Sequence, residues 1–556
     1  MPRVIGARAP TGPAPGMRWW GWGSDAHVTP WPPGAERLLH EEIAWRPRAT
    51  APVALDDVAL PARALPARAR ELLCAAVGAE HVRDDRLARV SHAVGRSYTD
   101  LLRIRSGDGS TAPDAVVAPA RGDQVTAVLA ACAKQHIAVV PFGGGTSVVG
   151  GVETVRDGFA GAIALNLRRL TIPVEVDRDS LLATLPAGLD GPAAEAALGA
   201  HGLTLGHFPQ SYEHATIGGF VATRSAGQNS TGYGRVDELV RGLHLVAPAG
   251  EVEVMPVPAS AAGPPLRELL VGSEGALGVI TRATLRVRRL PPATRAQAWA
   301  FPSFAAGAEA FRALEQAGGA PTIARLSDEH ETRLTLGLTA SGSSADRVGR
   351  RLLRAAAGRG PCLAILGWEG EPRAVRLRAL GALRTVRAHD AVPLGSGPAV
   401  RWCAGRFEGP YLRDALLDRG VLVETLETAT AWSGLAALHA AVGGALRAAL
   451  SARGTPPLVA CHISHLYATG ASLYFTVIAR QEPGAELEQW RAAKASATEV
   501  IVARRATITH HHAVGRDHLP WLEREIGPTG LAVLRAVKDR LDPTGIMNPG
   551  KLLPAR

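Results

Sequence analysis

The sequence has few cysteines, few aromatic residues and no long apolar run, and each shortage excludes a class of protein. Its 556 residues include 5 cysteines, far apart and without a CxxC pair, which argues against a disulfide framework or a zinc site and favours a reducing compartment. No apolar stretch approaches the roughly eighteen residues that a membrane-spanning helix needs. The opening MPRVIGARAP lacks the apolar core of a secretory signal, and the closing LLPAR is not an SKL-type peroxisomal address.

Dense runs of positive charge are also missing. The net charge of +10 comes from arginines scattered along the chain, whereas a nucleic-acid-binding arm concentrates its basic residues. The sequence therefore argues against a nucleic-acid partner and favours anionic small molecules or a lipid surface. The shares of hydrophobic residues, 46%, and of charged residues, 20%, are those of an ordinary globular protein, and the length favours several domains.

Changes of sequence pattern divide the chain into four parts. Residues 1–111 begin with a leader rich in Pro, Gly and Trp and continue with apolar spacing near 3.6, which predicts a mainly helical region. Residues 112–291 alternate short strands with amphipathic helices and begin with a β-α-β unit. A second α+β region spans 292–500, and 501–556 reads as a helix pair with a Pro/Gly-rich end. This arrangement predicts an α+β fold class.

A glycine-rich loop follows the second strand of the β-α-β unit. The stretch PFGGGTSVVGG (Pro141–Gly151) contains five glycines, but it is neither a Walker A motif nor a GxGxxG turn. Successive backbone N–H groups in such a turn form a nest for an anion, and missing Cβ atoms would let a pyrophosphate approach. The alternative is a tight bend at a sheet edge.

Two more glycine-punctuated turns favour the ligand over the bend. One lies in GHFPQSYEHATIGGFVATRSAGQNSTGYGRVDELV (Gly206–Val240), and the other is VGSEGALGVIT (Val271–Thr281), which enters a strand. Three such turns within one α+β region indicate a long ligand that lies across several loops.

These segments resemble those of a known flavoprotein superfamily. PFGGGTS, the TIGG to TGYG run and SEGALGVI are similar to the FAD-binding segment of vanillyl-alcohol-oxidase-type flavoproteins. MRWWGWG, EHATIGG, HLYATGASLYF, HHHAVG and DPTGIMNPGKLL further resemble, in the same order, the alkyldihydroxyacetonephosphate synthase family, which forms the ether bond of ether lipids. The resemblance implies a PCMH-type FAD-binding domain at 112–291, an α+β cap at 292–500, and a segment at 501–556 that returns to the active site.

The resemblance also implies how FAD is held. Its pyrophosphate would lie on the first glycine loop, and binding would be non-covalent, because Gly, Thr and Ser stand where covalent relatives carry a histidine. Gln210 departs from the family, whose members carry an acidic residue there. The implied FAD-binding residues are Pro141, Phe142, Gly143, Gly144, Gly145, Thr146, Ser147, Gln210, Ser211, Tyr212, Glu213, His214, Ala215, Thr216, Thr223, Arg224, Ser225, Ala226, Glu274, Gly275, Ala276, Leu277, Gly278, Val279 and Ile280.

The reaction that the resemblance implies exchanges the acyl chain of 1-acyl-dihydroxyacetone phosphate for a fatty alcohol. It would proceed through a covalent adduct at flavin N5 without net redox. Arg413 matches the residue that binds the substrate phosphate, and Arg325 matches an arginine close to the flavin; a surface charge and a structural salt bridge are the respective alternatives. Tyr474 matches the catalytic tyrosine and is preferred over Tyr467 because it follows the GASL turn, although a tyrosine on an apolar strand is often only core.

Three consecutive histidines, His510, His511 and His512, complete the candidate site. On an extended segment successive side chains alternate, which predicts that His510 and His512 face the site while His511 points elsewhere. Imidazoles suit proton transfer from an alcohol. A metal site and a solvated cluster are the alternatives; no metal is expected, because no acidic residue lies nearby in the sequence.

Two other functions compete with the synthase. A FAD-dependent 2-hydroxy-acid dehydrogenase, for D-lactate or glycolate, shares the flavin loops and the Asn548–Lys551 terminus, and a flavin-binding protein without activity is the third reading.

Because a fatty alcohol is poorly soluble, we expect a cytoplasmic protein attached peripherally to a membrane through positive charge and an amphipathic segment. Homodimer formation is left open.

Overall fold

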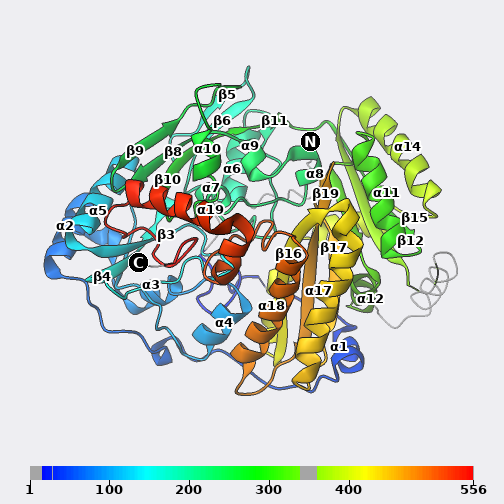
Figure 1. Cartoon of the computed structure of the whole chain (residues 1–556), viewed down its shortest axis with the longest axis horizontal. Coiled ribbons are helices and arrows are strands. Elements are labelled where there is room, and N and C mark those ends of the chain that lie inside the picture. The colour runs from blue at the N-terminus through cyan, green and yellow to red at the C-terminus, as the bar shows by residue number, and fades with distance from the viewer. Residues whose placement is uncertain (1–15, 28, 339–357, 359, 555–556) are drawn as a thin grey trace.

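The structure, a computed structural model, describes residues 16–27, 29–338, 358 and 360–554 (Figure 1). The opening segment and the last two residues, on which the targeting expectations partly rest, lie outside this range. The described part of the N-terminal region is mainly helical. Its helices are α1 (Ala35–Ile43), α2 (Ala67–Val77), α3 (Arg86–Ser91) and α4 (Tyr98–Arg105).

The first sheet of the FAD-binding region has the strand order β1-β2-β4-β3. Strands β2 and β3 both run parallel to β4, and α5 (Gly122–Gln135) connects them, as expected for a β-α-β unit. β1 comes from the N-terminal region, so the border expected at residues 111 and 112 divides this sheet. The strands are β1 (Val82–Arg83), β2 (Ala115–Val117), β3 (Ile137–Phe142) and β4 (Gly161–Asn166).

The second sheet of this region is antiparallel, with the order β5-β6-β10-β8-β9. The first glycine loop follows β3, the second leads into the helix α7 (Ile217–Ala222), and the third precedes β10. The strands of this sheet are β5 (Glu175–Asp177), β6 (Leu182–Pro186), β8 (Val240–Ala247), β9 (Gly250–Val254) and β10 (Val279–Arg286); helices α6 (Gly191–Gly199), α8 (Ser230–Tyr233), α9 (Val236–Leu239) and α10 (Leu266–Leu270) lie between them in the chain.

The cap is built on one larger antiparallel sheet with the order β15-β12-β14-β13-β17-β19-β16, and β18 pairs with β19. Helices α17 and α18 lie side by side along this sheet (Figure 1). The strands are β12 (Ala293–Phe301), β13 (Ile323–Ser327), β14 (Cys362–Gly370), β15 (Val392–Gly395), β16 (Val421–Ala431), β17 (Leu458–Ile463), β18 (Leu466–Tyr467) and β19 (Gly470–Arg480). The helices are α11 (Phe304–Gln316), α12 (Glu329–Leu338), α14 (Pro372–Ala388), α15 (Gly397–Gly405), α16 (Gly409–Leu417), α17 (Trp432–Ala452) and α18 (Glu486–Ala503).

Helix α17 is, among the described residues, the one helix long and apolar enough to cross a membrane. One of its faces, which includes Leu435, Leu438 and Leu446, is buried in the apolar core of the cap. The apolar composition of α17 is therefore explained by its packing against the cap sheet. The sequence analysis, which looked for a continuous apolar run, did not identify this helix.

The C-terminal segment returns to the FAD-binding region. After α19 (Leu519–Leu541) the chain runs beside β3, where the N–H of Val139 donates to the carbonyl of Ile546 and the N–H of Asn548 donates to the carbonyl of Val139, both at 2.8 Å. The border expected at residue 500 falls inside α18, which continues to Ala503 because its apolar face packs on α17.

Candidate active site

The glycine loops, the cap sheet and the C-terminal segment enclose a cavity of about 450 Å³. Segments far apart in the sequence therefore meet at one place, as a ligand lying across several loops requires. The predicted FAD-binding residues that line this cavity are Pro141, Phe142, Gly143, Gly144, Gly145, Thr146, Ser147, Gln210, Ser211, Ala215, Thr216, Thr223, Ser225, Ala226, Glu274, Gly275, Gly278, Val279 and Ile280.

The glycines of the first loop let it pack against the second loop. A Cβ on Gly143 would lie 2.3 Å from Oγ1 of Thr216, and a Cβ on Gly144 would lie 2.1 Å from the carbonyl oxygen of His214. Both distances are far shorter than a carbon atom tolerates. The neighbouring chain therefore requires glycine at these two positions, in addition to any ligand that approaches the loop.

Six predicted FAD-binding residues do not line the cavity. Tyr212 is buried against aromatic neighbours, and the Glu213 carboxylate accepts a hydrogen bond of 3.0 Å from the hydroxyl of Tyr411. Arg224 turns away and donates from Nε to the carbonyl of Val271 at 3.0 Å. These residues support the wall of the cavity from behind, and none of them belongs to the first glycine loop. The six are Tyr212, Glu213, His214, Arg224, Ala276 and Leu277.

The polar atoms around the cavity fit a polar dinucleotide. Nε2 of Gln210, Oε1 of Gln228 and Nε1 of Trp22 are buried without a hydrogen-bond partner among the described residues, and all three residues line the cavity. Since buried polar groups are normally satisfied, such atoms indicate a ligand. Gln210 also accepts a hydrogen bond of 3.1 Å from Gln228, so the neutral amide keeps its own donor free at the position where the family carries an acid.

Tyr474 lies between two imidazoles. It sits on β19 in register with His462 of β17, and the two rings stack with centroids 4.8 Å apart; the ring of His511 lies at 6.0 Å, nearly parallel. Burial raises the pKa of Tyr474 to about 12, so the phenol is neutral near pH 7. The alternative, Tyr467, does not line the cavity and instead bonds through its hydroxyl to Nε2 of His510 at 2.6 Å.

Arg325 is engaged in an ion pair inside the cavity. Its Nη2 lies 2.8 Å from Oε1 of Glu331 and 3.1 Å from Nδ1 of His462. Burial opposes the charge of Glu331, but Arg325 and His462 outweigh it and lower the pKa of that carboxyl to about 2. The salt bridge named as the alternative for Arg325 is therefore present. Arg325, Glu331 and His462 nevertheless all line the cavity. Arg325 is therefore held in place at the site by a fixed negative charge.

Arg413 offers free donors to the cavity. Its Nη1 donates to the carbonyl of Arg96 at 2.5 Å, while Nε and Nη2 are buried without a hydrogen-bond partner among the described residues. Nη2 lies 3.6 Å from Oδ1 of Asp414 in a long ion pair, and the other oxygen of Asp414 accepts from the backbone N–H of Trp22. A buried guanidinium with two free donors suits a bidentate anion such as a phosphate.

The N-terminal leader forms part of the cavity wall. Arg96 donates from Nε to the carbonyl of Gly21 at 3.0 Å and from Nη2 to that of Arg18 at 2.9 Å, which fixes the leader beside the site. Gly23 has a positive φ of 66°, and a Cβ there would lie 2.3 Å from the ring of Tyr411. The leader thus places Trp22 in the cavity, a residue that the sequence had not singled out.

The three histidines do not face the cavity in the expected pattern. His511 and His512 line it, whereas His510 points towards Tyr467 and His465, so the predicted roles of His510 and His511 are exchanged. The segment is bent rather than extended, since its backbone N–H groups converge on one buried carboxylate of Glu427. Burial lowers the pKa of all three imidazoles, that of His512 to about 3, so they are neutral near pH 7.

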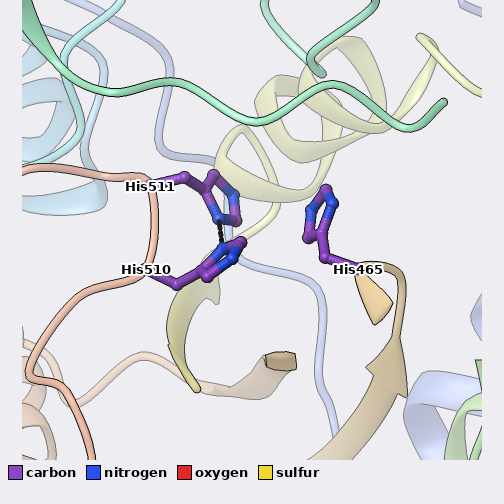
Figure 2. Close-up of side chains that lie close together, drawn as sticks. All are labelled: His465, His510 and His511. Carbon is purple, nitrogen blue, oxygen red and sulfur yellow. Dashed lines mark hydrogen bonds between the residues drawn. The ribbon is translucent and has the colours of Figure 1, made fainter. Parts of the chain in front are cut away.

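His465, His510 and His511 lie close enough to suggest a metal site, with ligand atoms within 4.8 Å of one another (Figure 2). Four of their six ring nitrogens have hydrogen-bond partners. Nδ1 of His465 lies 2.5 Å from Oγ of Ser230, Nε2 of His510 bonds Tyr467, and Nδ1 of His510 lies 2.9 Å from Nδ1 of His511. The hydrogen-bond network accounts for the cluster, and the absence of a metal stays a prediction.

Several cavity residues were not predicted. Trp22, Gln228 and His465 lie inside the quoted motifs but were not selected from them, whereas Glu331, Glu424 and His462 lie outside those motifs. A charged residue or histidine inside a buried strand was the available signal, as in VLVETLETATA and LVACHI. The missed residues that line the cavity include Trp22, Gln228, Glu331, Glu424, His462 and His465.

Comparison with known proteins agrees with this geometry. Residues 113–255 match the FAD binding domain family, and residues 290–552 match the C-terminal domain of FAD linked oxidases. Alkyldihydroxyacetonephosphate synthase of Dictyostelium discoideum is 32% identical over 85% of this chain and 79% of its own length.

A solved structure of alkyldihydroxyacetonephosphate synthase superposes with a TM-score of 0.84 at 28% identity, covering 96% of this chain and 99% of that one. Substrate-bound p-cresol methylhydroxylase shares the fold alone, with a TM-score of 0.65 at 14% identity over 88% and 96% of the two chains. The α+β fold class and the FAD cofactor are thereby confirmed.

Proposed function

The chain belongs to the alkyldihydroxyacetonephosphate synthase family of FAD-dependent enzymes, which act in ether-lipid synthesis, and from this premise we propose the reaction that its cavity performs. The substrate is a 1-acyl-dihydroxyacetone phosphate, and a long-chain fatty alcohol replaces the acyl chain. The C1–O bond to the acyl group breaks and the carboxylate leaves with the electron pair. The alcohol oxygen then forms the new C1–O bond, so no electrons are gained or lost overall.

The chain divides the work between binding and proton transfer. The glycine loops would hold FAD, which would supply covalent catalysis at the C1 carbon through its N5 atom. Arg413 binds the phosphate through its free Nε and Nη2. Tyr474, a neutral phenol, takes the C1 proton as its own proton passes to an adjacent imidazole, and His462 and His511 are the bases whose rings lie against it. The same groups return a proton to C1 after the alcohol has formed its bond. His512, neutral and at the cavity, accepts the proton of the incoming alcohol.

One observation carries this proposal: a single cavity holds the glycine loops of the FAD site, the stacked Tyr474 and the buried Arg413 with two unpaired donors. The fork of a guanidinium binds a carboxylate or a phosphate with two parallel hydrogen bonds, so Arg413 would fit the substrate of a 2-hydroxy-acid dehydrogenase as well. The family to which the chain belongs favours the phosphate-bearing substrate.

The test is a direct comparison of substrates with the purified holoenzyme. Under anaerobic conditions, acyl-dihydroxyacetone phosphate should perturb the flavin spectrum and D-lactate should not. With hexadecanol present, labelled fatty acid should be released in step with alkyl-dihydroxyacetone phosphate and without an electron acceptor. Acyl-dihydroxyacetone without its phosphate should react at least tenfold less well, in line with about 1.5–3 kcal/mol for a charged hydrogen bond. Bleaching by lactate with no release of fatty acid would establish the dehydrogenase instead.

We further propose that helix α14 (Pro372–Ala388) attaches the enzyme to an anionic membrane surface. It carries five arginines and no acidic residue, and the side chains of Leu377 and Leu380 are 60% and 47% exposed. Exposed leucines among arginines are typical of a helix that lies in the lipid interface.

Sedimentation with lipid vesicles tests this attachment. The holoenzyme should pellet with phosphatidylcholine vesicles that contain phosphatidylserine, and less with phosphatidylcholine alone or at high salt. The pair Arg373→Gln and Arg376→Gln should weaken binding roughly fivefold for each arginine, at about 1 kcal/mol per charge near the surface. Arg295→Gln on the edge of the cap sheet is the matched control. Equal sedimentation of the α14 variant and the wild type would refute the role of this helix.

A further inference from the structure

A buried carboxylate, that of Glu427, sits beneath the three histidines. Glu427 lies on β16, and its side chain is fully shielded from solvent. It accepts hydrogen bonds from the backbone N–H groups of three consecutive residues, His510 at 2.6 Å, His511 at 3.1 Å and His512 at 2.9 Å. A fourth comes from the hydroxyl of Thr509 at 2.7 Å. Such a set of donors fixes the backbone of the histidine segment around one side chain.

Glu427 is also tied to the catalytic tyrosine. In the antiparallel pair β16 and β19, Glu427 stands directly opposite Tyr474, so the two side chains lie on the same face of the cap sheet. Tyr474 and the carboxylate that binds the histidine segment, that of Glu427, thus occupy paired positions on neighbouring strands. The distance between phenol and imidazoles is therefore set by the sheet itself.

A second carboxylate holds the next part of the segment from the other domain. Glu274, in the third glycine loop, accepts from the backbone N–H of Val514 at 2.8 Å and of Gly515 at 2.7 Å. The histidine segment is thus held by the cap through Glu427 and by the FAD-binding region through Glu274. Of the two, only Glu427 bonds the histidines themselves.

The charge of Glu427 also faces the imidazoles. Its oxygens lie 3.5 Å from Nδ1 of His511 and 3.8 Å from Nδ1 of His512. Burial alone would raise the pKa of the Glu427 carboxyl, but the facing histidines and Thr509 hold it well below its usual range, so it is ionised. A fixed negative charge at this distance stabilises an imidazolium whenever one of these rings takes up a proton.

From these contacts we infer that Glu427 is a positioning residue for the exchange reaction. It holds His511 and His512 towards Tyr474 and offsets the positive charge that forms when an imidazole accepts the proton of the alcohol. The inference rests on the proposed function. It predicts that losing the carboxylate slows the chemistry while leaving substrate binding intact, because Arg413 belongs to another element and makes no contact with Glu427.

The variant Glu427→Gln tests this with two measurements. In hydrogen–deuterium exchange, the peptide covering residues 506–515 should exchange at least tenfold faster, because the amide nitrogen of glutamine cannot accept the N–H groups that the carboxylate binds. The value of kcat should fall about 100-fold, the loss expected when catalytic groups move by about 1 Å. KM for acyl-dihydroxyacetone phosphate and the FAD content should stay within twofold of the wild type. Glu427→Asp, which keeps the charge, should recover at least a tenth of the lost rate.

Glu195→Gln is the matched control. Glu195 is another buried carboxylate that accepts a hydroxyl, from Thr204 at 2.7 Å, and two backbone N–H groups, those of Leu205 and Gly206, yet it lies off the cavity. Its variant should speed exchange in residues 203–207 and keep kcat. If the wild type is active and Glu427→Gln has the same kcat, the inference is overturned. It is also overturned if Glu427→Gln changes only KM or only the FAD content. If Glu427→Gln does not fold, a Glu427→Asp variant no faster than one thousandth of the wild type would also overturn it. A wild type that releases no fatty acid would refute the proposed function. The hydrogen–deuterium exchange measurement would still be valid in that case, because it does not depend on activity.

Discussion

Replacing Tyr474 with phenylalanine is expected to leave FAD bound and to lower kcat by about 10²–10⁴-fold, the usual contribution of a general acid or base. The hydroxyl is the only group removed, and the ring keeps its stacking with His462 and His511. In the proposed mechanism the phenol, which is neutral near pH 7, passes a proton on to a neighbouring imidazole. Phenylalanine offers no proton to pass, whereas the binding of the phosphate by Arg413 is untouched.

The measurement combines the flavin absorbance of the purified variant with the release of labelled fatty acid at saturating substrate. KM should change by less than threefold, which separates a loss of chemistry from a loss of binding. Tyr98→Phe is the matched control, since Tyr98 is a buried tyrosine whose ring packs in the cap core away from the cavity. A Tyr474→Phe enzyme that keeps a tenth or more of the wild-type rate would remove the tyrosine from the mechanism.

The parts of the site that depend on local patterns could be predicted from the sequence. A strand followed by consecutive glycines predicts a loop at the carboxyl edge of a sheet, and this is where Gly143 and Gly144 lie. The cavity then collects the three glycine turns, as their repetition within one region indicated. Tyr474 and Arg413 also line the cavity, although the family resemblance rather than any local pattern pointed to them.

The parts of the site that depend on contacts between distant residues could not be predicted from the sequence. Which histidines face the cavity is decided by Glu427, more than eighty residues earlier in the chain, and no periodicity of the HHH segment contains that information. Trp22 reaches the cavity because its backbone bonds Asp414, 392 residues away in sequence. Alternation was the wrong rule for the histidines because it assumes an extended strand, and a carboxylate that gathers three adjacent N–H groups bends the chain instead.

The glycine loop provides the second large effect, because its tolerance for a side chain can be read from the neighbouring loop. Gly144→Ala is expected to lower the FAD content of the purified protein at least tenfold. The added Cβ would lie 2.1 Å from the carbonyl oxygen of His214 and 2.7 Å from its carbonyl carbon, so backbone rather than a flexible side chain would have to move. Moving it displaces Ala215 and Thr216, which line the cavity, and Thr216 also caps helix α7 through a hydrogen bond to Gly219.

The comparison that isolates this effect is Gly199→Ala in helix α6 of the same domain, where an added Cβ meets no atom within 4 Å. That variant should bind FAD fully and be as stable as the wild type or more so, by about 0.5–1 kcal/mol, since alanine favours a helix over glycine. Flavin absorbance per protein and thermal unfolding, measured with and without added FAD, distinguish a distorted site from a protein that does not fold. If Gly144→Ala carried a full complement of FAD, the two loops would not need their close contact, and the first loop would be glycine-rich for the ligand alone.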